Sequence, residues 1–136
     1  MSFRARPARR GRLYFEVHIF ADVRALRAYG RSCDPPITGM VAGACRPWET
    51  MRVRKDGRTK RSPHIGEILL AADHLTVGIV PHECMHAALA WARRTRLNLD
   101  AMPHEERACY ALSNLTRTIY RRCFAAGLLV ESRSAA

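Results

Sequence analysis

Residues 13–20 alternate between apolar and polar side chains. The apolar side chains that share one face of this stretch are Leu13, Phe15, Val17 and Ile19. A period of two over eight residues predicts a strand with one buried face. Asp22 is a suitable N-cap for a short helix after this strand, and Gly30 is a suitable residue to end that helix.

The middle of the chain predicts a loop followed by a hairpin. Residues 32–43 contain Pro35, Pro36, Gly39 and Gly43, which favours a loop. Residues 48–53 and 59–64 flank the pair Asp56-Gly57, a strong signal for two strands joined by a tight turn. Residues 65–71 are rich in aliphatic side chains and predict a further strand.

Two long helices are predicted after these strands. The first begins near residue 76 or 80 and runs to 96, with Pro81 in its first turn, where a missing N–H has no cost. Residues 98–102 interrupt the pattern. The second runs from 103 to about 126, where Gly127 ends it. Strands followed by helices predict an α+β fold, a small twisted sheet packed on the two helices. We assign one domain to residues 13–130, with a basic segment at 1–12 and a tail at 131–136.

Composition places few further limits on the chain. It has 136 residues, of which 48% are hydrophobic, and no apolar stretch is long enough to span a bilayer. Its five cysteines are irregularly spaced and form no CxxC pair. This argues against a disulfide framework and predicts reduced thiols in the cytoplasm, in a bacterial or phage-infected cell.

The net charge of +11 favours an acidic partner, either nucleic acid or an acidic protein surface. Part of this charge is concentrated in the predicted hairpin, where the candidate phosphate-binding residues are Arg52, Arg54, Lys55, Arg58, Lys60 and Arg61. Few aromatic residues lie among them, so base stacking is not indicated. A charged hairpin that is simply solvated explains the same pattern.

The segment His82-Glu83-Cys84-Met85-His86 carries the clearest chemical signal. Its two histidines are four residues apart on a predicted helix, so both imidazoles leave the same face and can bind one zinc ion. Glu83 lies beside them as a candidate general base that removes a proton from a metal-bound water. The alternative is that the two histidines only pack or cap.

A catalytic zinc ion usually needs a third protein ligand. The second helix starts with His104, Glu105 and Glu106, and a hairpin of two helices would bring this turn back towards the first. Either glutamate could complete the coordination. Acidic residues in a first turn also favour the positive end of the helix dipole, so one glutamate could serve each purpose. Tyr110 is a candidate for stabilising an oxyanion on a cleaved amide.

The motif and the glutamate that follows it resemble the zincin-like metallopeptidases of phages and mobile elements. The similarity covers about residues 65–120. It implies one zinc ion per chain, bound by His82, His86 and Glu106, with Glu105 in the competing register. It also implies a curved sheet against the active-site helix, with zinc in the cleft between the helices. Cys109 departs from the usual alanine of that family.

Two functions are therefore expected from the sequence. The first is a zinc-dependent metallopeptidase that cleaves a protein or peptide with Glu83 as general base. The second is a non-catalytic phage or mobile-element accessory or inhibitor protein, which binds a host protein or nucleic acid through its basic surface.

Overall fold

The computed structural model describes residues 1–39, 42–49 and 51–129, except for the side chain of Arg52. The chain is α+β, and its elements in order are β1 (Ser2–Ala5), β2 (Tyr14–Phe20), α1 (Val23–Ser32), β3 (Gly43–Pro47), β4 (Met51–Val53), β5 (Thr59–Arg61), β6 (His64–Ala71), the short 3-10 helix η1 (Ala72–His74), α2 (Ile79–Arg94) and α3 (Met102–Ala125).

The main sheet is mixed, with strand order β1-β2-β6-β3. β2 and β6 pair in parallel, while β1 and β3 are antiparallel to their neighbours. All but the first residue of β6 are buried, as expected for a central strand covered on both faces. The edges of the described sheet are therefore β1 on one side and β3 on the other.

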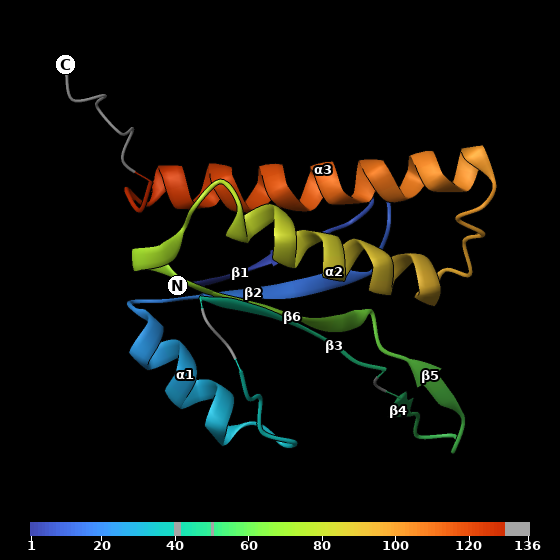
Figure 1. Ribbon diagram of the computed structural model, residues 1–136. Coiled ribbons are helices and arrows are strands. Elements are labelled where there is room, and N and C mark those ends of the chain that lie inside the picture. Colours follow the sequence, from blue (N-terminus) through green and yellow to red (C-terminus); the bar gives the residue numbers. More distant parts are fainter. Residues whose placement is uncertain (40–41, 50, 130–136) are drawn as a thin grey trace.

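Helices cover both faces of this sheet (Figure 1). α2 and α3 lie together on one face, where Val80 and Cys84 of α2 and Leu115 of α3 enter one core with Val17 and Ile68 of the sheet. α1 covers the other face. Its Leu26 packs with Leu69 and Ala71 in a smaller core. The fold thus has three layers, with α2 above the β3 side of the sheet.

Gly66 of β6 lies very close to the two neighbouring strands. Its φ is +155°, and a Cβ built there would lie 2.6 Å from the carbonyl oxygen of Arg46 and 2.9 Å from the ring of Phe15. Only a residue without a side chain fits this conformation and this space. The glycine therefore lets β3 and β2 approach β6 closely at this point.

Several predicted elements are confirmed. They are the strands at 13–20 and 65–71, the hairpin, and both long helices. The N-cap is also confirmed, because the backbone N–H of Ala25 donates to Asp22 Oδ1 at 2.7 Å. The predicted end of α1 at Gly30 is wrong. That glycine is buried, and the helix continues to Ser32, so the small residue serves packing rather than termination.

The strand predicted at 48–53 is also wrong in its extent. β4 covers only Met51–Val53, and β3 at Gly43–Pro47 begins inside the predicted loop. Residues 40, 41 and 50 lie outside the described part.

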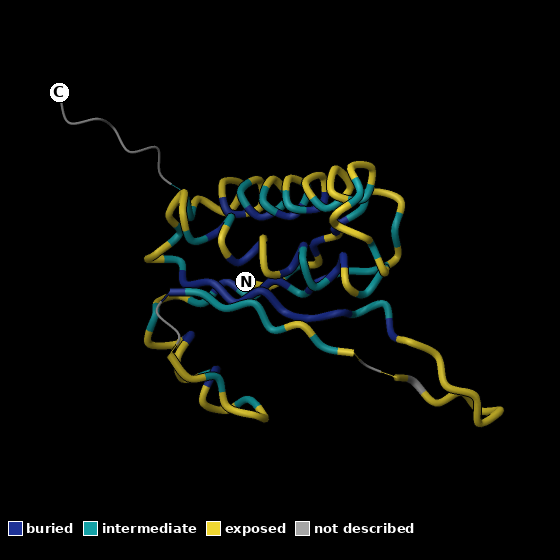
Figure 2. The backbone as a smooth tube through the Cα atoms, turned by 45° about the vertical axis from the view of Figure 1, so that its right-hand side comes forward, coloured by how far each residue is buried: buried dark blue, intermediate teal, exposed yellow. Residues whose placement is uncertain are grey.

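The N-terminal segment is not a separate extension, because Ser2–Ala5 pair with β2 and Ala5 is fully buried. By contrast, the β4–β5 hairpin projects from the body and is exposed over most of its length (Figure 2). The tail at 131–136 lies outside the described residues.

Candidate functional site

The HExxH segment lies in the first turns of α2, next to the edge strand β3 (Figure 1). The hydroxyl of Thr76 accepts a hydrogen bond from the N–H of Ile79 at 3.1 Å and so caps the helix start. Val80, Cys84 and Ala87 are buried in the core. Because these three face the core, the helical period turns His82, Glu83 and His86 towards the β3 side of α2.

His82 and His86 bring their imidazoles together on the exposed side of α2. Their Nε2 atoms are 3.3 Å apart, and their ring planes meet at 79°. Two nitrogen ligands at about 2.0–2.1 Å from a tetrahedral zinc ion are separated by roughly 3.3–3.4 Å. The same distance suits a hydrogen bond between two neutral imidazoles. The sequence prediction that these two side chains converge is therefore confirmed.

Glu83 is the charged residue of α2 that turns inward. It is only 5% exposed, and its Cγ lies 3.0 Å from where a Cβ on Gly43 would stand. Burial raises the pKa of the Glu83 carboxyl above its usual range. Both imidazoles and a hydrogen bond from the backbone N–H of Cys45 act in the opposite direction. The carboxyl is thus held between β3 and the two histidines.

A groove runs between β3 and α2 on both sides of Glu83. One part, of about 450 Å³, is lined by Gly43, His74, Thr76, His82 and Glu83 among others. The next part, of about 310 Å³, is lined by Gly43, Cys45, Glu83, His86 and Arg93 among others. Since Gly43 and Glu83 line both parts, Glu83 lies where the two parts adjoin.

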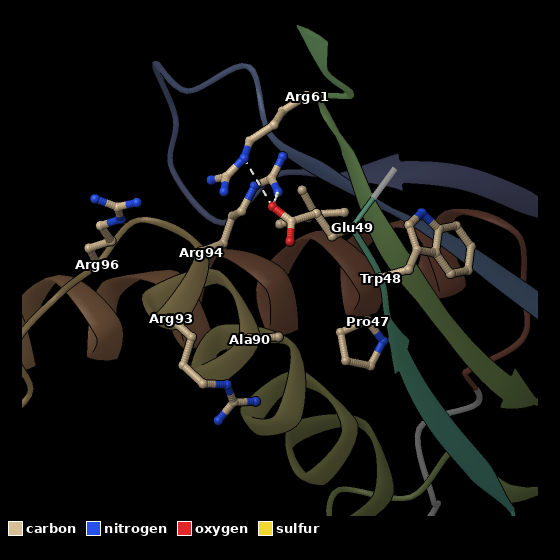
Figure 3. A pocket seen from close by; sticks show the side chains of 9 residues that line it. Pro47, Trp48, Glu49, Arg61, Ala90, Arg93, Arg94 and Arg96 are labelled. Atoms are coloured by element: carbon tan, nitrogen blue, oxygen red, sulfur yellow. Dashed lines mark hydrogen bonds and ion pairs between the residues drawn. The ribbon is translucent and has the colours of Figure 1, made fainter. Parts of the chain in front are cut away.

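A basic pocket adjoins the groove, and Figure 3 shows side chains that line this pocket. This pocket, of about 330 Å³, shares Pro47 and Arg93 with the groove. Figure 3 shows Arg61 and Arg94 converging on Glu49, and the Nε of Arg61 lies 3.0 Å from Glu49 Oε1. The pocket is lined by four arginines against that one carboxylate, so its charge stays positive.

The predicted third ligand does not reach the histidines. The guanidinium of Arg107 lies 5.9 Å from the centre of the Trp91 ring, which places the first turns of α3 beside the second half of α2. Trp91 itself is five residues beyond His86, roughly 7 Å further along the helix axis. Glu105 and Glu106 are both exposed.

Within the described part of the chain, no group of three His, Cys, Asp or Glu residues is placed to hold a metal ion. The direction of the two helices explains this. His82 and His86 line the groove beside Gly43 of β3, and no residue of α3 lines it. The histidines therefore open towards the sheet edge, and the expected cleft between the helices is not where they point.

The two tyrosines of α3 differ in position, and only Tyr110 was a predicted site residue. Tyr110 is 64% exposed on the outer face of the helix. Tyr120 is closer to the groove, because its hydroxyl donates to the carbonyl oxygen of Thr76 at 3.3 Å. Thr76 in turn lines the groove with His82. Helical position alone could not separate the two residues, since this depends on how α3 crosses α2.

His74 is a groove residue that the sequence did not single out. It lines the same part of the groove as His82. Its Nδ1 lies 3.0 Å from Asp73 Oδ1. Its Nε2 is therefore the ring nitrogen that could bind a ligand. A carboxylate on the far nitrogen is the usual partner of a metal-binding histidine.

A second polar cluster, on the α1 face of the sheet, was not predicted. Glu67 Oε1 accepts a hydrogen bond from the hydroxyl of Tyr29 at 2.9 Å and lies 3.2 Å from His18 Nε2, and its Oε2 lies 3.5 Å from Arg46. Burial and this carboxylate raise the pKa of Tyr29 to about 12. The cluster ties α1 and β3 to the central strand.

The cysteines near the site are not suited to act as nucleophiles. Burial raises the pKa of the Cys45 thiol to about 12 and that of Cys84 to about 11. A thiol with so high a pKa is almost entirely protonated at neutral pH and reacts slowly. The two thiols are therefore poor candidates for a nucleophile beside the groove.

The basic hairpin is where the sequence placed it. Arg54, Lys55, Arg58 and Lys60 are exposed, and Arg61 at its base is paired with Glu49. The side chain of Arg52 lies outside the described part. The structure brings none of the hairpin's tip residues to the HExxH groove.

No described helix is long and apolar enough to cross a bilayer. Comparison with known protein families, with characterised proteins and with solved structures gave no match. The functional assignment therefore depends on the chemistry of the residues described above.

Proposed function

We propose that the chain is a metal-dependent peptidase in which Glu83 is the general base. One observation carries this proposal. The Nε2 atoms of His82 and His86 converge at 3.3 Å, with the buried residue Glu83 next to them where the two parts of the groove adjoin. Two nitrogen ligands and a carboxylate base at an open groove are the components of metal-assisted hydrolysis.

The residues present fit a zinc ion in part. The spacing of the two imidazoles matches that of two tetrahedral ligands, whereas Glu105 and Glu106 do not fit as a third. His74 lines the same part of the groove as His82, but the described residues form no group of three metal-binding side chains. A zinc ion held by His82 and His86 would supply a bound water of lowered pKa and would polarise a peptide carbonyl.

The chain's own residues perform the proton transfers. Glu83 accepts a hydrogen bond from the backbone N–H of Cys45, and its carboxylate would accept a proton from the attacking water. The same carboxyl then returns the proton to the leaving amine. Its burial between Gly43 and the histidines fixes it in place for both steps.

The groove also suggests the form of the substrate. β3 is an edge strand, and an edge strand offers unpaired backbone groups to an extended peptide. The basic pocket beyond Arg93 favours an acidic side chain on the segment that reaches it. We therefore propose a protein or peptide substrate bound in extended form, with an acidic residue at one end.

Zinc titration tests the metal site. Calorimetry of metal-free protein should give one zinc ion per chain, and His82→Ala or His86→Ala should weaken binding by at least a hundredfold. Glu106→Ala is the matched control and should bind zinc as the native chain does. His74→Ala reports whether the groove histidine contributes. Absence of zinc binding in the native chain would contradict the proposal.

Hydrolysis tests the catalytic role. Native protein with zinc should cleave members of a fluorogenic peptide library, preferring acidic ones. Glu83→Gln should reduce the rate by about a hundred- to ten-thousandfold while zinc affinity is kept. If Glu83→Gln cleaves as well as the native chain, or if no peptide is cleaved although zinc binds, the non-catalytic binding role is supported instead.

A further inference from the structure

A second groove lies at the opposite edge of the sheet, where β1 and the segment after it meet α3. Its volume is about 560 Å³, and it is lined by Arg4, Arg6, Arg9, Asn114, Arg117, Thr118 and Arg121. We refer to these seven residues as the arginine groove. Three of its arginines come from the first ten residues and two from α3, so folding joins sequences that are over a hundred residues apart.

The arginine groove is built on a fixed frame. The side chain of Pro7 is fully buried, and its carbonyl oxygen accepts a hydrogen bond from Asn114 Nδ2 at 2.9 Å. Arg117 in turn donates to Asn114 Oδ1 at 2.7 Å. The N-terminal segment is therefore held against the helix, and its arginines are presented at set positions rather than on a loose tail.

Five arginines line this groove, and Glu16 lies opposite one of them, Arg4, in the β1–β2 register. No Asp or Glu is among the residues that line it. Arg117 and Arg121 are four residues apart on one helix, a spacing at which like charges repel and destabilise the helix. A surface that concentrates repulsion in this way gains stability when a partner brings several negative charges to it.

We propose that the arginine groove binds the phosphodiester backbone of a nucleic-acid duplex without reading its sequence. Guanidinium groups match phosphate oxygens in bidentate geometry, and a duplex carries a phosphate charge about every 1.7 Å along its axis. No aromatic side chain lines the groove, so it lacks the stacking surface that single-stranded bases need. The proposal is independent of peptidase activity.

The test uses fluorescence anisotropy with a labelled duplex of about 20 base pairs and arbitrary sequence. The groove variant is Arg6→Gln/Arg117→Gln/Arg121→Gln. The matched control is Arg54→Gln/Lys55→Gln/Arg58→Gln, which removes the same charge from the exposed hairpin. Circular dichroism confirms that both remain folded. If the groove variant unfolds, Arg121→Gln alone is used.

We expect the groove variant to bind the duplex at least tenfold more weakly. The slope of log affinity against log salt concentration should fall by about two to three, roughly 0.9 for each lost contact. The hairpin control should stay within twofold of the native chain. For Arg121→Gln alone, the expected loss is about twofold and the slope should fall by about 0.9.

Three results would overturn the proposal. One is an equal or greater loss in the hairpin control, since attraction would then follow net charge alone. Another is no binding by the native chain at 50 mM salt. The third is equally tight binding of a polyglutamate peptide of matched charge, which would favour an acidic protein as the partner.

Discussion

The β3 edge and the β1 edge of the same sheet present two different kinds of surface. At the β3 edge the groups are few and closely fitted, with Glu83 buried against Gly43 and held by Cys45. At the β1 edge, five arginines line one groove, and those on α3 stand in solvent. A closely fitted site depends on the position of each side chain, whereas a charged surface depends on the total charge of its side chains. Single substitutions should therefore affect the two edges to very different degrees.

The largest expected effect is a loss of folding stability when the polar cluster that holds the β3 edge is broken. Arg46 of β3 is held by the buried carboxylate of Glu67, which also binds Tyr29 and His18. Glu67→Gln removes that charge and should destabilise the fold by about 3 kcal/mol. Glu16→Gln, on the adjacent strand in register with Glu67, is the control and should change stability little. Urea unfolding measures both, and equal effects would show that β3 does not depend on this cluster.

A methyl group should be enough to disturb the β3 edge. The Cβ of Gly43→Ala would lie 3.0 Å from Glu83 Cγ, so this substitution should lower peptide hydrolysis by about tenfold through displacement of the carboxyl. Gly78 lines the same groove, and the nearest atom to its Cβ would be 3.8 Å away. Gly78→Ala should therefore keep activity. Similar kinetics for the two variants would remove the basis for calling the β3 edge a fitted site.

The smallest effect is expected at the β1 edge, and its sign is opposite. Arg121→Gln relieves the repulsion with Arg117 and should stabilise the folded chain by about 0.3 kcal/mol at low salt. The gain should vanish at high salt, because screening weakens the repulsion. Thermal unfolding at two salt concentrations measures this. Destabilisation at low salt would mean that Arg121 makes a favourable contact in the free protein.

Local features of the sequence predicted the parts of the fold that depend on neighbours along the chain. The alternation at residues 13–20 and the Asp56-Gly57 turn gave the correct elements. The convergence of His82 and His86 was also predictable, because a helix fixes the relation of residues four apart. The position of Glu83 beside the two histidines was predictable for the same reason.

The predictions that failed depend on how segments far apart in the sequence pack against one another. Glu106 has a suitable position along the chain, but α3 meets α2 with Arg107 beside Trp91, too far along the helix. β3 lacks an alternating pattern, since both its faces are half-buried. The arginine groove could not be seen in the sequence, because Asn114 joins Pro7 only in the folded chain.

The close packing around Gly66 limits which amino acids this position can accept. A methyl group there would overlap the backbone at Arg46 and Pro47, whereas Gly39 and Gly57 have nothing within 4 Å of a Cβ and carry only the cost of a positive φ. In a saturation library selected for folding, position 66 should admit glycine alone, while the two loop glycines admit asparagine or aspartate. The junction of β2, β6 and β3 would thus appear as an invariant position beside tolerant ones.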